Sequence, residues 1–272
     1  MKKLLILLLM LGINPILKAQ KTDVVVIGNV HRPMPNYNAD TLFNILVKIK
    51  PDIILHEMDS TFFTENFDFI GPSNENEQNA SIKYRTVNPA VMIRPFEFEG
   101  RTQYRLDTGI KQSENPTMQL LDSLYAAGSF TKEDRATIAE YKRLTEQLNA
   151  FGFKYGKDFN NKTTDSISKL RQYYQHYKIR GVINGNKAFS GKFVTTATNK
   201  TISFAEGYNR FCDFWDMRNK AMANNILAIV RSNPGKKIVV LTGYFHRYYL
   251  LELLHKAQDD SKFNIHEFYD YK

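Results

Sequence analysis

The most constraining feature of this sequence is a short pattern that occurs near both ends of the chain. Residues 24–32 read Val-Val-Val-Ile-Gly-Asn-Val-His-Arg, and residues 238–247 read Ile-Val-Val-Leu-Thr-Gly-Tyr-Phe-His-Arg. Each stretch begins with a run of valine, isoleucine or leucine and ends in Gly-x-x-His-Arg. An apolar run without polar alternation predicts a strand that is buried on both faces, as in a parallel sheet. We expect the glycine to let the chain turn sharply where each strand ends.

The histidines of this pattern, His31 and His246, are candidate site residues because of where they should lie. Each follows a predicted strand through Gly-x-x, so it is expected just beyond the carboxyl end of that strand. Open α/β sheets place their ligands at this edge. Two histidines that are far apart in the sequence are therefore predicted to converge on one site.

A third strand is predicted between the two copies of the pattern. A predicted helix separates it from the first copy. Residues 51–59 read Pro-Asp-Ile-Ile-Leu-His-Glu-Met-Asp and contain a short apolar run. The preceding residues 39–50 have apolar side chains at helical spacing, with Asp40 or Thr41 as the expected N-cap. The order strand, helix, strand predicts a right-handed crossover that makes the two strands parallel neighbours.

The third strand supplies a carboxylate, Glu57. The crossover is expected to place Glu57 at the same edge of the sheet as His31, whereas His56 should point to the opposite face of its strand. Two histidines and one glutamate at strand ends can bind a divalent metal or perform acid–base chemistry. We therefore take His31, Glu57 and His246 as candidate metal ligands and as candidate catalytic residues.

The expected fold class is α/β, with a mostly parallel central sheet flanked by helices. The chain has 272 residues, of which 43% are hydrophobic, which is enough for the core of a single domain at 20–272. A helical insertion is expected at about 114–182, where Thr131 followed by Asp134 predicts an N-cap. A long helix is expected at 208–231, before the last strand and its Gly-x-x-His.

Other segments of the chain give weaker patterns. Residues 61–92 are expected to be irregular, with a surface loop at 71–79, and residues 181–200 are also expected to form a loop. The C-terminal residues predict a helix at 248–257 and a last strand at 264–269. In the middle of the chain, a second apolar helix face is expected at Ile167, Leu170, Tyr174 and Tyr177.

The first 19 residues are expected to be a signal peptide rather than part of the fold. Lys2 and Lys3 form a basic start, residues 4–13 are apolar, and residues 17–19 form a cleavage site. The apolar stretch is too short to span a bilayer comfortably, so we expect an exported protein, periplasmic or extracellular, with no stable membrane span after cleavage. An uncleaved anchor is the alternative.

The charge of the chain argues against nucleic acid as a partner. The formal net charge is +9, but the basic residues are scattered along the sequence, and no nucleic-acid-binding motif is present. A small molecule or a peptide is the expected substrate.

The chain resembles a superfamily that includes TraB/PrgY proteins, the Tiki proteases, the ChaN-like haem-binding proteins and the erythromycin esterases. The resemblance is carried by the two Gly-x-x-His phrases, by Glu57 at a strand end, and by residues 218–226. This last segment, Arg-Asn-Lys-Ala-Met-Ala-Asn-Asn-Ile, is similar to the Arg-(Asp/Asn)-x-x-Met-Ala-x-Asn helix of that group. The resemblance covers the two ends of the chain and omits its helical middle.

This resemblance implies a site and three alternative functions. In a Tiki-like hydrolase, His31, Glu57 and His246 would hold Mn²⁺, Co²⁺ or Zn²⁺ and activate a water for attack on a peptide, ester or amide. In an esterase-like hydrolase without a metal, His31 would act as the general base and Glu57 would orient it. A ChaN-like protein would bind haem without catalysis. Arg218 matches a helix arginine that faces the site, and it is expected to stabilise negative charge while contributing little to folding stability.

Overall fold

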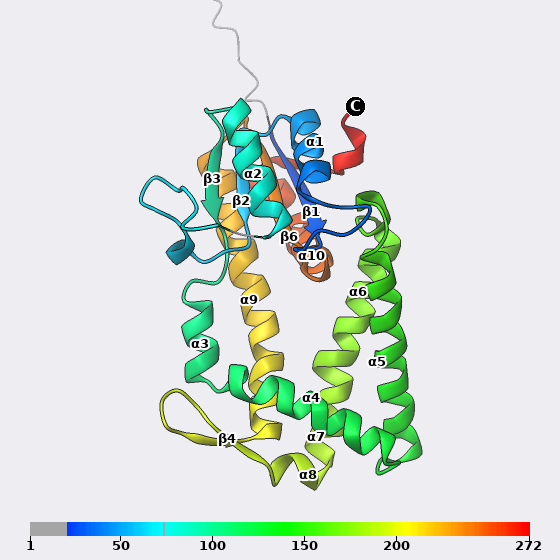
Figure 1. Cartoon of the computed structure of the whole chain (residues 1–272). Coiled ribbons are helices and arrows are strands. Elements are labelled where there is room, and N and C mark those ends of the chain that lie inside the picture. The colour runs from blue at the N-terminus through cyan, green and yellow to red at the C-terminus, as the bar shows by residue number, and fades with distance from the viewer. Residues whose placement is uncertain (1–20, 73) are drawn as a thin grey trace, which may run out of the picture.

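The computed structural model describes residues 21–72 and 74–272 of the chain. The expected signal peptide, residues 1–19, lies outside this part. Within it, none of the helices is both long and apolar enough to cross a membrane. The described chain forms a three-layer α/β unit, from which a group of long helices extends (Figure 1).

The central sheet has five parallel strands, which confirms the expected α/β fold class. The strands are β1 (Thr22–Asn29), β2 (Ile53–His56), β3 (Met92–Pro95), β6 (Lys237–Gly243) and β7 (Phe263–His266), in the order β3-β2-β6-β1-β7. The expectation that β1 and β2 are neighbours is wrong, because β6 lies between them and pairs with both. Since β6 is buried along nearly its whole length, the central position in the sheet is the one that its sequence favours.

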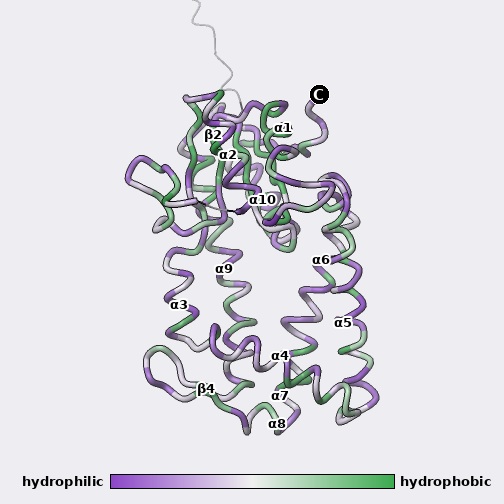
Figure 2. The backbone as a smooth tube through the Cα atoms, viewed as in Figure 1, coloured by the Kyte–Doolittle hydropathy of each residue, from purple (hydrophilic) through white to green (hydrophobic). Residues whose placement is uncertain are grey.

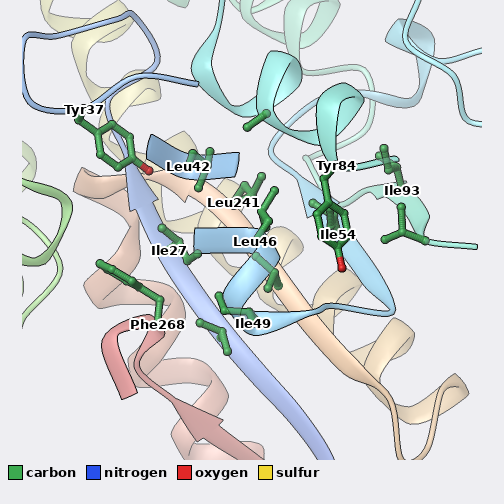
Figure 3. Packing of buried hydrophobic residues seen from close by; sticks show 14 of the residues in the cluster. Ile27, Tyr37, Leu42, Leu46, Ile49, Ile54, Tyr84, Ile93, Leu241 and Phe268 are labelled. Carbon is green, nitrogen blue, oxygen red and sulfur yellow. The ribbon is translucent and has the colours of Figure 1, made fainter. Parts of the chain in front are cut away.

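Helices cover both faces of this sheet and enclose two apolar clusters. One face packs against α1 (Ala39–Ile49) and α2 (Asn76–Val87); its buried cluster is seen in Figure 3 and includes Ile27, Leu42, Leu46, Ile54, Tyr84 and Leu241. The other face packs against the C-terminal half of α9 (Phe204–Ser232) and against α10 (Tyr244–Ser261). Successive residues of β1 alternate between the clusters, so the apolar runs of the sequence are buried on both sides. In Figure 2 the hydrophobic colour concentrates on these strands.

The helices of the middle extend further than the expected 114–182. They are α3 (Arg101–Asp107), α4 (Ile110–Ala126), α5 (Lys132–Phe151), α6 (Lys162–Tyr173), a π-helix (Tyr174–Lys178), α7 (Ile179–Gly185) and α8 (Lys187–Ser190). A hairpin of β4 (Phe193–Thr195) and β5 (Thr201–Ser203) follows them. The N-terminal half of α9 packs against these helices, so α9 joins the two parts of the molecule (Figure 1).

Several local expectations are corrected by the structure. Residues 76–87 form α2 rather than a loop, and most of residues 179–190 are helical. The N-cap of α1 is Asn38, whose side chain accepts a hydrogen bond from the backbone of Thr41. The last helix begins at Tyr244 instead of residue 248, and β7 ends at 266. Thr131 does cap α5, as predicted.

The apolar face expected on α6 is wrong. Leu170 and Tyr177 are 42% and 52% exposed, whereas the buried residues of α6 are polar: Thr164, Ser168, Arg171 and Gln172. Arg171 lies in a network with Tyr141 and Gln172, so polar partners in neighbouring helices hold this surface. Hydrophobic spacing predicts the wrong face where a helix packs through hydrogen bonds.

Candidate functional site

A cavity of about 700 Å³ opens at the carboxyl ends of β1, β2 and β6. This is the edge at which open parallel sheets bind their ligands. All four predicted site residues, His31, Glu57, Arg218 and His246, line it, together with Arg32, Met58, Asp59, Phe62, Glu77, Glu97, Arg101, Trp215, Tyr244 and Phe245. The order of the strands explains why these residues converge. β6, which leads to His246, lies between β1, which leads to His31, and β2, which leads to Glu57.

The two glycines of the repeated pattern allow the strand ends to approach each other. An added Cβ at Gly28 would lie 2.8 Å from the Cα of Tyr244, at the start of α10. An added Cβ at Gly243 would lie 3.2 Å from Nε2 of His31. Gly243 has a φ of −58°, and Gly28 is not among the glycines with positive φ, so close packing rather than an unusual turn requires glycine at both positions.

His246 is a buried, neutral imidazole with a fixed orientation. Its Nδ1 lies 2.8 Å from Oδ1 of Asn219. The Asn219 amide is oriented by its Nδ2, which donates to the carbonyl of Trp215 at 2.7 Å, so Nδ1 of His246 carries the proton. Nε2 of His246 then accepts from Nη1 of Arg218 at 2.5 Å. Burial lowers the pKa of His246 to about 3, which agrees with this neutral form.

Arg218 is the centre of a buried ionic network. Its Nε and Nη2 donate to the two carboxylate oxygens of Glu97, at 2.8 and 2.5 Å, and Nη2 also donates to Glu57 at 2.5 Å. With the contact to His246, four of the five guanidinium N–H groups have acceptors. Burial opposes the charge of Arg218, but the two carboxylates raise its pKa above the usual range. The expected small contribution of Arg218 to stability therefore does not agree with its burial.

Glu57 is held as a carboxylate by three hydrogen-bond donors. One oxygen accepts from Arg218, and the other accepts from the hydroxyl of Thr242 and from the backbone N–H of Gly243 at 2.8 Å. Burial alone would raise the pKa of Glu57, but the positive charge of Arg218 and the Thr242 hydrogen bond lower it below the usual range. Both oxygens of Glu57 therefore already have donors from the protein.

The partner of His31 is Glu77, which the sequence patterns did not single out. Oε1 of Glu77 lies 2.7 Å from Nδ1 of His31, and Glu77 is itself buried. The hydrogen bond to Glu77 and its charge raise the pKa of His31 to about 9, although burial opposes the shift. Nδ1 is thus occupied, and Nε2 lies over Gly243 in the wall of the cavity. The expected orientation of His31 by Glu57 is not what this geometry provides.

Glu77 was missed because it lies in α2, in a segment that we expected to be a loop. The residue before it, Asn76, binds the His31 segment through its backbone N–H to the carbonyl of His31 and through its side chain to the carbonyls of Val30 and Arg32. The first turn of α2 therefore fixes both the backbone and the ring of His31. The sequence of 76–87 gives little signal for this pair, because the residues that α2 buries are mostly polar and the apolar Ile82 and Val87 are exposed.

The remaining residues of the 218–226 segment have structural roles around the site. Asn225 donates to the carbonyls of Phe96 and Glu97, at 3.2 and 3.0 Å, and so fixes the segment that carries the Glu97 carboxylate. Met222 is buried in the apolar cluster under the sheet. Together with Arg218 and Asn219, these residues make one helix face that organises the floor of the cavity.

The donor atoms expected to bind a metal do not fit one in this arrangement. Nε2 of His246 and Oε1 of Glu57 lie 3.6 Å apart, but both face the guanidinium of Arg218. His31 has a raised pKa, and a metal requires the neutral ring. Among the residues that the structure describes, no three His, Cys, Asp or Glu side chains are arranged to hold an ion. The cation bound by Glu57, Glu97 and His246 is the side chain of Arg218.

Comparison of the chain with models of protein families, with curated proteins and with solved structures finds no match. The resemblance to the TraB and Tiki superfamily therefore rests on the motifs of the sequence and stays a prediction.

Proposed function

We propose that this protein is an exported hydrolase that cleaves an ester, amide or peptide bond without a metal, with His31 as the general base. The observation that carries the proposal is the His31–Glu77 pair, with Nδ1 bound to a buried carboxylate at 2.7 Å and Nε2 close to Gly243, a residue of the cavity wall. A carboxylate that accepts the Nδ1 proton fixes the tautomer in which Nε2 can take a proton from water, once the pH approaches the His31 pKa of about 9 and the ring becomes neutral.

The other groups of the cavity support a charge-stabilising role. Arg218 lines the cavity, and the first backbone N–H groups of α10 lie at the same strand end, where a helix terminus favours negative charge. Both can stabilise the oxyanion that forms when water attacks a carbonyl. Glu57 and His246 hold Arg218 in place and are positioning residues in this scheme, because their acceptor atoms bind Arg218 or the strand end.

The test is a panel of ester, amide, lactone and peptide substrates, assayed with the mature protein beside His31→Gln and Glu77→Gln. We expect turnover that His31→Gln reduces by at least a hundredfold, the usual contribution of a positioned base. His255→Gln is the matched control, because His255 is exposed and pairs with Gln258 away from the cavity.

Two outcomes would replace this proposal with one of the other functions. Loss of turnover on chelation, restored by Mn²⁺, Co²⁺ or Zn²⁺, would support the metal-dependent hydrolase. A Soret band on titration with haem, without turnover of any substrate, would support a haem-binding protein. Equal turnover by the wild type and His31→Gln would exclude His31 as the base.

A further inference from the structure

The guanidinium of Arg101, in the cavity wall, faces the carboxylate of Glu97, which Arg218 already neutralises. Arg101 begins α3, lines the cavity and has 38% of its side chain exposed. Its ion pair is with Oε2 of Glu97, at 3.5 Å. That same oxygen accepts from Nη2 of Arg218 at 2.5 Å, and the other oxygen of Glu97 accepts from Nε of Arg218 at 2.8 Å. The charge of Arg101 is therefore only weakly compensated by the protein.

Two carboxylates of the cavity wall, Glu57 and Asp59, are committed to other donors. Glu57 binds Arg218, Thr242 and Gly243, and Asp59 binds the backbone N–H groups of Thr61 and Gly100. The second Asp59 contact fixes the start of α3, and with it the position from which Arg101 extends. Burial and the charge of Arg218 lower the pKa of Arg101, so an anion that entered the cavity would relieve an unfavourable charge.

Part of the wall is suited to an apolar molecule. The aromatic side chains of Phe62, Trp215, Tyr244 and Phe245 line the same cavity, whose volume of about 700 Å³ can hold a small organic ligand. An apolar body with one anionic group would use both features, because the aromatic rings cover its body and the guanidinium receives its charge.

We infer that Arg101 is an anion subsite that binds a carboxylate group, and that the substrates of this protein carry a carboxylate on an apolar body. The planar guanidinium can donate two parallel hydrogen bonds to such a group. That the bound anion is a substrate rests on the proposed hydrolase activity. Binding of the anion does not depend on that activity, so activity and binding can be tested separately.

Trp215 offers a direct measurement, because it is the single tryptophan of the chain and lies in the cavity wall. We would titrate the protein with 4-nitrobenzoate and with 4-nitrobenzamide and follow the quenching of Trp215, corrected with free tryptophan. These probes have similar size and differ in charge. The variants are Arg101→Gln and Arg101→Lys. Arg105→Gln is the control, because Arg105 is one helical turn away, pairs with Glu114 and lies outside the cavity lining.

We expect the wild type to bind the benzoate at least tenfold more tightly than the amide, as a charge-assisted hydrogen bond implies. Arg101→Gln should remove that difference, Arg101→Lys should keep part of it because the charge remains, and Arg105→Gln should leave it unchanged. Equal affinity of the wild type for both probes, or benzoate binding that Arg101→Gln does not weaken, would overturn the inference. A protein that binds the benzoate through Arg101 but hydrolyses nothing would refute the proposed hydrolase and keep the anion subsite.

Discussion

The two copies of the Gly-x-x-His-Arg pattern end in opposite environments. His31 is 51% exposed at its side chain and has a raised pKa, and Arg32 is exposed at the cavity wall. His246 and Arg247 are buried, and His246 has a lowered pKa. Arg247 donates to the carbonyl of Val26 and pairs with two carboxylates. One copy therefore exposes its histidine and arginine at the cavity wall, and the other buries both of these side chains.

The structural element after each copy accounts for the difference. After β1 the chain enters a loop, and its histidine lies free of regular structure except for the contacts from α2. After β6 the chain enters α10 at once, which turns its histidine and arginine inward within the first turn. A sequence pattern at a strand end thus fixes where a side chain starts, while the next element decides whether it meets solvent or the core.

Among the buried side chains, Arg218 should contribute most to the free energy of unfolding. Arg218→Ala leaves Glu57 and Glu97 buried without their cation, and we expect a loss of about 3–5 kcal/mol in the free energy of unfolding. Urea denaturation measures it. Arg180→Ala, which breaks a more exposed pair with Asp213, should cost no more than about 1 kcal/mol. A loss of that small size for Arg218→Ala would show that its network does not hold the fold.

The two arginines of the repeated pattern, Arg32 and Arg247, allow a direct test of the difference between the two copies. Arg247→Met leaves Asp165 and Glu267 without their partner, and we expect a loss of about 2 kcal/mol, below the fully buried case because both carboxylates are partly exposed. Arg32→Met should change stability by no more than about 0.5 kcal/mol. Similar losses in both variants, measured by thermal unfolding, would contradict the assignment of separate roles.

A third histidine, His176, extends the comparison between buried and exposed imidazole rings. His176 is buried, stacks on Trp215 with ring centroids 4.9 Å apart, and has no hydrogen-bond partner at either ring nitrogen among the described residues. His176→Phe keeps the stacking and removes the unsatisfied groups, so we expect a gain of about 1 kcal/mol. His176→Ala should be destabilising because it leaves a cavity. Destabilisation by His176→Phe would mean that the ring nitrogens have a partner.

The smallest expected change in the free energy of unfolding comes from the titration of His31, for which the buried His246 is the comparison. The pKa of His31 is raised from 6.5 to about 9, so its pair with Glu77 stabilises the fold fully below pH 6.5 and loses that effect as the pH rises through about 9. Because His31 is half exposed, solvent screens the pair, and we expect less than about 1 kcal/mol.

NMR titration of the imidazole signals measures this directly. Glu77→Gln should return the pKa of His31 toward its ordinary value and shift the rising limb of the pH–rate profile in the same direction, because the base loses its anionic partner. His246 should not titrate between pH 5 and 9, since its pKa is lowered to about 3. A His31 that titrates at its ordinary pKa in the wild type would contradict the pairing with Glu77.

The sheet and its carboxyl edge could be predicted from the sequence because they depend on local apolar runs. The same runs place His31, Glu57 and His246 at strand ends that share one edge. The order of the strands could not be predicted this way, because the insertion of β6 between β1 and β2 is a choice among long-range pairings. Glu77 could not be predicted for a related reason, because its role is defined by a partner from a distant segment, His31.

The central position of β6 also has a consequence for the order in which the protein can fold during synthesis. The first 236 residues contain β1, β2 and β3, but the strand that joins β1 to β2 begins only at Lys237. Until β6 has been synthesised, the nascent chain therefore carries β1 as a single strand and β2 paired only with β3, both with open edges. Contacts of such high sequence separation slow folding, so assembly of the cavity should be a late event that follows the synthesis of β6.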